Sequence, residues 1–185
     1  SIVSGMYTRS GFLRKLQKLA ANDTQSASQH ALLVVAIDWY AGIRRIAGET
    51  ASNTITNTMA RAIKRVAGEN CVSAYLGDGR FATLLLGQSL EAAKNAAELL
   101  AKDLGTRESH HESIPRPAIS SAIVPWSVSV DSVRCLNEAL EALALAEHTP
   151  GSRVLQYGEF SKERTAWNEE LSRGNPFTSI VAQDI

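Results

Sequence analysis

Charged and flexible residues meet in one short segment, Gly77-Asp78-Gly79-Arg80-Phe81, which lies between two apolar runs. The Asp78-Gly79 dipeptide accepts the positive φ angles of a two-residue turn, so the pattern predicts a β-hairpin. A chemical role for this turn stays open, although the pattern favours a purely structural one. For Arg80, a solvated or ion-paired guanidinium is favoured over a ligand for phosphate.

Asp38 follows directly on the apolar run of residues 31–37, Ala-Leu-Leu-Val-Val-Ala-Ile. A carboxylate at the end of a strand could take part in chemistry, or it could cap the helical segment that comes next. Trp39 and Tyr40 are interpreted as packing residues rather than as platforms for base stacking.

His110 and His111, next to Glu112, raise the question of a metal site. Adjacent residues usually point in different directions and no further ligand is close in the sequence, so we interpret this stretch as an exposed loop and predict no metal site. Cys71 and Cys135 are the only cysteines. They are interpreted as reduced thiols of the core.

Hydrophobic periodicity predicts the elements that would position these residues. Apolar residues recur at helical spacing over residues 10–22, 52–66, 90–104 and 133–143. The expected N-caps of the last three helices are Ser52, Ser89 and either Asp131 or Ser132. Strands are expected over residues 31–37, within the hairpin 71–86, and over 118–124 and 153–157. Strands that alternate with helices around one hairpin predict an α/β domain with a mixed sheet.

Composition narrows the class of protein. Of the 185 residues, 44% are hydrophobic and 21% are charged, which suits one sizeable packed domain. Nineteen basic and nineteen acidic residues cancel, so no positive surplus favours nucleic acid or an anionic membrane as a partner. No apolar run approaches the roughly 20 residues that span a bilayer. A reducing cytoplasmic location fits these features, and the opening Ser-Ile-Val is interpreted as the start of a fragment of a longer protein.

The hairpin segment resembles the signature of the GGDEF family of diguanylate cyclases, in which Gly-Gly-Asp/Glu-Glu-Phe occupies the turn. Further segments are similar to the family's other motifs, in the same order: residues 5–12 (Gly-Met-Tyr-Thr-Arg and Phe12), residues 36–53 (Ala-Ile-Asp-Trp-Tyr through Gly48 to Asn53) and residues 139–154 (Ala-Leu-Glu-Ala-Leu through Arg-Val). Together the matches cover residues 1–158.

The resemblance implies an α/β fold of the GGDEF or nucleotide-cyclase type, with a mixed sheet and a ferredoxin-like βαββαβ core flanked by helices. It implies a degenerate GGDEF-like domain over residues 1–158, followed over residues 159–185 by a C-terminal helix and a linker toward a further domain. In this tail, Trp167 and Leu171 are four residues apart and would lie on one side of a helix.

The sequence departs from the family at the positions that hold metal. The family joins two GTP molecules with the help of two divalent ions, and the resemblance places the two metal-holding carboxylates at Ala36 and Gly79. Two-metal catalysis needs anionic oxygens to hold the ions, and neither residue has one. Asp38 matches the second Asp of its motif, whereas Asp78 is out of register with the acidic position of the turn.

The positions that the resemblance assigns to the substrate also differ. The residues that read guanine fall on Arg44 and Asn53, which we keep with Asp38 as weak candidates for nucleotide binding. The cations that hold phosphate fall on Glu147 and Gly151. A carboxylate close to a phosphate charge is repulsive by about 4 kcal/mol at an effective dielectric constant near 20.

Two further departures point the same way. Arg80 stands where the hairpin of the family has a Glu, and the Arg-x-x-Asp feedback site for cyclic di-GMP falls on residues 68–71, Gly-Glu-Asn-Cys. The sequence therefore predicts a catalytically inactive, GGDEF-like regulatory or interaction domain of a bacterial-type signalling protein, without cofactor or metal. Its expected partners are flanking signalling domains and a second copy in a homodimer. The alternatives are a sensor that binds GTP or another purine nucleotide without turnover and, less favoured, an active diguanylate cyclase.

Overall fold

The computed structural model describes residues 3, 5–22, 29–106, 117–148, 153–156 and 173 of the chain. The predicted loop of residues 107–116 and the predicted tail helix of residues 161–172 lie outside this part, so both stay predictions. The elements are, in chain order, α1 (Arg9–Asn22), β1 (His30–Ile37), α2 (Tyr40–Ala67), β2 (Cys71–Gly77), β3 (Arg80–Leu85), α3 (Leu90–Thr106), β4 (Ile119–Trp126), α4 (Ser132–Glu147) and β5 (Arg153–Gln156).

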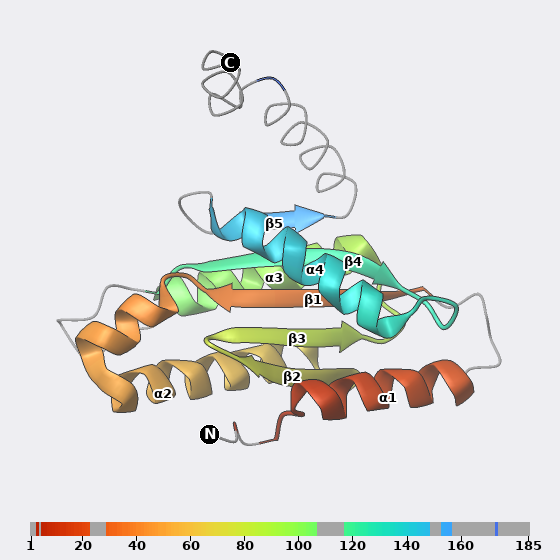
Figure 1. Cartoon of the computed structure of the whole chain (residues 1–185), viewed down its shortest axis with the longest axis horizontal. Coiled ribbons are helices and arrows are strands. Elements are labelled where there is room, and N and C mark those ends of the chain that lie inside the picture. Colours follow the sequence, from red (N-terminus) through yellow and green to blue (C-terminus); the bar gives the residue numbers. More distant parts are fainter. Residues whose placement is uncertain are drawn as a thin grey trace, which may run out of the picture.

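The five strands form one sheet in the order β2-β3-β1-β4-β5 (Figure 1). The central strand β1 pairs antiparallel with both β3 and β4, whereas β4 pairs parallel with β5. The run β1-α2-β2-β3-α3-β4 is the βαββαβ core, and α1, α4 and β5 are added to it. The α/β fold with a mixed sheet is therefore confirmed.

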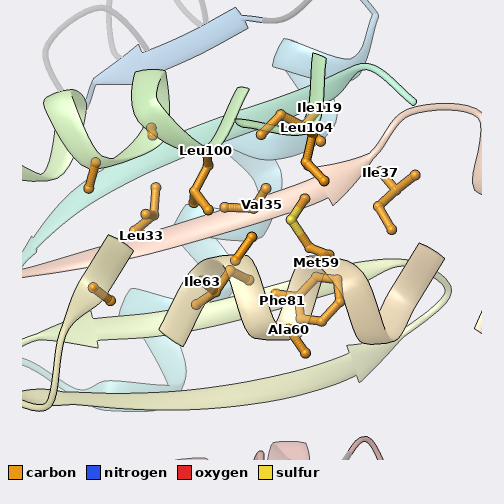
Figure 2. Packing of buried hydrophobic residues seen from close by; sticks show 14 of the residues in the cluster. Leu33, Val35, Ile37, Met59, Ala60, Ile63, Phe81, Leu100, Leu104 and Ile119 are labelled. Atoms are coloured by element: carbon orange, nitrogen blue, oxygen red, sulfur yellow. The ribbon is translucent and has the colours of Figure 1, made fainter. Parts of the chain in front are cut away.

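Helices cover both faces of the sheet, which explains why all of β1 is buried (Figure 1). Leu33, Val35 and Ile37 face α2 and α3 and pack with residues such as Met59, Ile63 and Leu100 (Figure 2). The residues between them, Leu32, Val34 and Ala36, face α1 and α4 and belong to a second core cluster. Because successive strand residues point to opposite faces, a continuous apolar run is what a strand between two helical layers requires.

Two predicted helix starts are confirmed. The side chain of Asp131 accepts hydrogen bonds from the backbone N–H groups of Val133 and Arg134 at the start of α4. The Ser89 hydroxyl accepts one from Ala92 N–H at the start of α3. Val133, predicted on the apolar face of α4, is exposed instead, because the buried stripe of this helix runs through Cys135, Leu136, Ala139, Ala142, Leu143 and Ala146.

The predicted start of the second helix at Ser52 is wrong. Helix α2 begins at Tyr40 and continues past Gly48, whose φ of 86° and ψ of 175° produce a kink inside it. Ser52 is buried within the helix, and its hydroxyl donates a hydrogen bond to Glu49 O at 2.9 Å. A glycine adopts such dihedral angles without strain, so α2 consists of two helical stretches that meet at Gly48. The two predicted segments are therefore present, and only the start at Ser52 is wrong.

Candidate functional site

The predicted hairpin is present, and its turn has the expected geometry. Asp78 has a φ of 49° and Gly79 a φ of 73°, so both central residues are left-handed, as a type I′ turn between right-twisted strands requires. Gly77 also has a positive φ, of 94°, where the pairing register of β2 and β3 shifts by one residue. The predicted positive φ of Gly79 is therefore confirmed.

Close packing against α2 fixes the turn in place. Gly79 donates a hydrogen bond from its N–H to the Tyr75 hydroxyl at 3.2 Å and accepts one at its carbonyl from Ile37 N–H at 2.9 Å. A Cβ atom on Gly79 would lie only 2.7 Å from Cγ of Tyr40. Tyr40 itself is buried, and its hydroxyl is 3.1 Å from Oγ1 of Thr56. The turn therefore needs glycine both for its φ angle and for space.

Arg80 and Glu147 form a two-point ion pair across this end of the sheet. Arg80 Nε donates to Glu147 Oε1 and Arg80 Nη2 donates to Glu147 Oε2, each at 3.2 Å. The side chains are 44% and 25% exposed. Arg80 begins β3, and Glu147 is the last residue of α4. Of the two favoured interpretations of Arg80, the ion-paired one is confirmed.

Asp38 is tied to the next strand and does not cap α2. Its Oδ1 accepts a hydrogen bond from the Ser120 hydroxyl at 2.7 Å, and its backbone N–H donates to Ala118 O at 2.8 Å. Partial burial raises the pKa of the Asp38 carboxyl, and the negative charge of Glu147 raises it further, whereas the Ser120 hydrogen bond opposes the shift. The capping interpretation is wrong, because the turn needed before α2 is made by Trp39 in a left-handed conformation, without a side-chain cap.

Trp39 is not the packing residue that the sequence predicts. Its side chain is 60% exposed, and its φ is 55°. The ring lies along the first turn of α2, where a Cβ atom on Gly42 would clash with it. Absence of a side chain at Gly42 thus makes room for the indole outside the core, whereas the packing interpretation of Tyr40 is confirmed.

The three candidates for nucleotide binding are Asp38, Arg44 and Asn53. Within the described residues they form no hydrogen bond or ion pair with one another. Arg44 reaches the hairpin, with its Nη1 3.9 Å from Oδ1 of Asp78, but both side chains are exposed and such a pair contributes little. Asn53 lies beyond the Gly48 kink of α2, and within the described residues it makes no hydrogen bond to Asp38, Arg44 or the hairpin. Gly151 lies outside the described residues.

The residues at the two metal-holding positions do not fit a pair of divalent ions. Ala36 is 1% exposed and sits in register between Arg80 on β3 and Ser120 on β4. Gly79 has no side chain, and the adjacent Arg80 brings a positive charge that repels a cation. In the part of the chain that the structure describes, no group of three or more His, Cys, Asp and Glu side chains is arranged to hold a metal ion.

The hairpin, the strand order and the helices on both faces point to one family. Residues 2–153 match the family model described as "Diguanylate cyclase, GGDEF domain". The chain belongs to the GGDEF family. A search of curated proteins finds no match. The described part of this GGDEF chain has no helix that is both long enough and apolar enough to cross a bilayer.

Solved structures with the same fold include other GGDEF domains. The GGDEF domain of FimX from Pseudomonas aeruginosa matches with a TM-score of 0.74 at 20% identity, over 84% of this chain and 98% of that one. The GGDEF domain of DgcB from Caulobacter crescentus, in complex with c-di-GMP, has a TM-score of 0.76 at 18% identity. The match covers 84% of this chain and 94% of that one. The diguanylate cyclase SiaD from Pseudomonas aeruginosa, in complex with its activator SiaC, matches with a TM-score of 0.75 at 16% identity. The match covers 84% of this chain and 60% of that one.

Sequence reasoning singles out Asp38, Arg80 and Glu147 but misses what they touch. The Ser120 bond to Asp38 joins residues 82 positions apart, and the Arg80 bond to Glu147 joins residues 67 apart. One signal was available for the second pair. The resemblance expects an acid at position 80 and a base at position 147, and the sequence has the reverse at both.

Proposed function

We propose that this GGDEF domain is catalytically inactive and works as a regulatory or interaction domain in a signalling protein related to cyclic di-GMP. The observation that carries the proposal is the ion pair between Arg80 and Glu147. The family resemblance assigns position 147 to a cation that holds phosphate and places an acid at position 80. Here each charge is reversed, and each is neutralised by the other within the domain.

This pairing argues against a triphosphate at the same place. A phosphate would have to separate Arg80 from Glu147 and then lie beside the Glu147 carboxylate, and like charges at close range repel. Ala36 and Gly79 add no anionic oxygen with which a divalent ion could offset that repulsion. The proposal therefore assigns a structural role to the end of the sheet that holds Ala36, Gly79, Arg80 and Glu147, which we call the hairpin end.

The proposed work of the domain is protein–protein contact: dimerisation, or coupling between flanking domains of the same chain. A protein that contains this fold, the diguanylate cyclase SiaD, is seen in complex with its activator SiaC. We include a cytoplasmic location in the proposal, which the free thiols of Cys71 and Cys135 support.

A nucleotide sensor without turnover is the second candidate, and Trp39 favours it. A bulky residue with positive φ is strained, and such strain is retained mainly where the surroundings or the function demand it. Here it presents an exposed indole on the first turn of α2, and an indole face can stack on a base.

The first test is cyclase activity. The purified chain is incubated with GTP or ATP and with Mg²⁺ or Mn²⁺, and cyclic products are separated by chromatography. We expect no product, and turnover that disappears in Asp38→Asn or Asp78→Asn would overturn the proposal by showing a rebuilt site.

Calorimetry with GTP and with cyclic di-GMP then separates the two candidates. The interaction domain predicts no saturable heat for either ligand. A micromolar dissociation constant for GTP that is weakened in Trp39→Ala, with Tyr7→Ala as the control at another exposed aromatic residue, would favour the sensor.

A further inference from the structure

One serine hydroxyl of the sheet has no hydrogen-bond partner within the described residues, although its residue is almost fully buried. The described part of the chain buries eight polar side chains. Seven of them have a hydrogen-bond partner, namely His30, Ser52, Thr56, Ser73, Thr83, Ser120 and Ser132. The eighth, Ser121, is 1% exposed, and its hydroxyl makes no hydrogen bond within the described residues. A hydroxyl on a buried residue is costly unless a partner can approach it, so its surroundings need an explanation.

Ser121 lines a cleft between α3, β4 and β5. Its neighbour Ser120 points to the α4 face and bonds Asp38, so Ser121 points to the opposite face, toward α3. There it forms part of the wall of a cavity of about 340 Å³. No fully buried side-chain oxygen or nitrogen in the described part lacks a partner, so the Ser121 oxygen reaches into this cleft.

The cleft combines an apolar body with two opposite charges. Ala97, Ala101, Ile119 and Val154 supply apolar walls. Lys94 and Glu98 also line it. They are four residues apart and therefore neighbours on one face of α3. Within the described residues neither forms an ion pair, not even with the other, so both charges are available at the cleft.

We propose that this cleft binds a small zwitterion with an apolar side group, such as a branched-chain amino acid. The carboxylate would meet the Lys94 ammonium, the ammonium would meet the Glu98 carboxylate, and the Ser121 hydroxyl would bond one of them. The apolar group would lie against Ala97, Ala101 and Ile119. A volume of about 340 Å³ is at the small end of the range for ligand sites, which suits a molecule of this size.

The site is independent of the proposed function of the hairpin end. It lies on the α2 and α3 side of the sheet, whereas Asp38, Arg80 and Glu147 lie on the α4 side. Absence of cyclase activity therefore leaves the cleft untouched, and failure of the cleft to bind leaves the interaction domain untouched.

The experiment uses L-leucine as the probe and the full chain as the protein. Chemical shifts of the backbone amides are followed during titration. We expect saturable shifts in the millimolar range, centred on residues 94–101 and 119–121. Three analogues each lack one feature: 4-methylpentanoate lacks the ammonium, 3-methylbutylamine lacks the carboxylate, and glycine lacks the apolar group. Each should bind at least about tenfold more weakly than leucine, a loss of about 1.4 kcal/mol.

Variants assign the binding to the cleft. Lys94→Ala should weaken leucine binding at least about tenfold, whereas Lys102→Ala, an exposed lysine of the same helix outside the cleft, should not change it. Ser121→Ala removes only the hydroxyl and should also weaken binding. Unsaturable shifts, shifts centred elsewhere, or equal effects of the two lysine variants would each overturn the assignment of leucine binding to this cleft. Binding of 4-methylpentanoate as tight as that of leucine would overturn the zwitterion assignment.

Discussion

Reversal of the charges of Arg80 and Glu147 should reveal how much this ion pair contributes to stability. In Arg80→Glu, two carboxylates would replace the pair that now meets at 3.2 Å. Two charges 4 Å apart interact by about 4 kcal/mol at an effective dielectric constant of 20. Exposure of 44% and 25% lets the side chains move apart and lets salt screen them. We therefore expect a loss of about 1–2 kcal/mol in the free energy of unfolding.

The double variant Arg80→Glu/Glu147→Arg restores an attractive pair in the opposite orientation. It should regain about 1 kcal/mol or more relative to the sum of the two single changes, since residues in direct contact are not additive. Arg134 and Glu138 form an exposed pair within α4 at 3.0 Å and serve as the matched control. Their reversal should show a coupling of only a few tenths of a kcal/mol, as is usual for helix pairs at i, i+4.

Urea unfolding, monitored by circular dichroism, measures the free energy of unfolding of the wild type, the two single variants and the double variant for each pair. The measurement is repeated at about 1 M salt, where the Debye length falls to roughly 3 Å and the coupling should shrink. A coupling between positions 80 and 147 below about 0.3 kcal/mol, within the scatter of independent sites, would refute the reasoning. The ion pair would then be a contact without energetic weight, and the argument that it opposes a bound triphosphate would lose its basis.

Three further variants test the local physics. Gly79→Ala should cost at least about 1 kcal/mol more than Gly87→Ala, because both have a positive φ but only Gly79 meets Tyr40; equal melting temperatures would contradict the contact. Asp38→Asn should raise stability at neutral pH. A raised pKa means that the folded state holds its proton more tightly, so wild-type stability falls as pH rises from the ordinary Asp value through the raised one. The gain should vanish at pH below the ordinary value, and a constant gain would refute the assignment. Ser132→Ala should cost about 1–3 kcal/mol, because it leaves the buried Trp126 Nε1 without an acceptor.

Local signals predicted the parts of the fold that depend on neighbours in sequence. The apolar run of β1, the Asp78-Gly79 turn and the caps Ser89 and Asp131 all follow from a few adjacent residues. The start of the second helical stretch of α2 did not, because the helix resumes directly after Gly48 and Ser52 lies inside it. A glycine inside a helical pattern fits both a boundary and a kink, so the pattern alone leaves open the residue at which the helix resumes.

The candidate site was predicted in its residues but not in its contacts. Position within the family motifs singled out Asp38, Arg80 and Glu147, whereas their pairing depends on the register of β3 and β4 on β1. That register places Arg80 and Ser120 on either side of Ala36 and brings the end of α4 over them. Trp39 was misplaced for a similar reason. An aromatic residue is usually buried. Here Gly42 has no side chain, so the indole of Trp39 packs against it on the outside of α2.

The departures at this end of the sheet depend on one another. Ala36 is almost fully buried beside Arg80. An Asp there without metal would either bear the cost of burying a charge or compete with Glu147 for the guanidinium. Either outcome would disturb the Arg80–Glu147 pair that now holds β3 to the end of α4. A carboxylate at position 36 would therefore fit this end of the sheet only together with changes at positions 80 and 147.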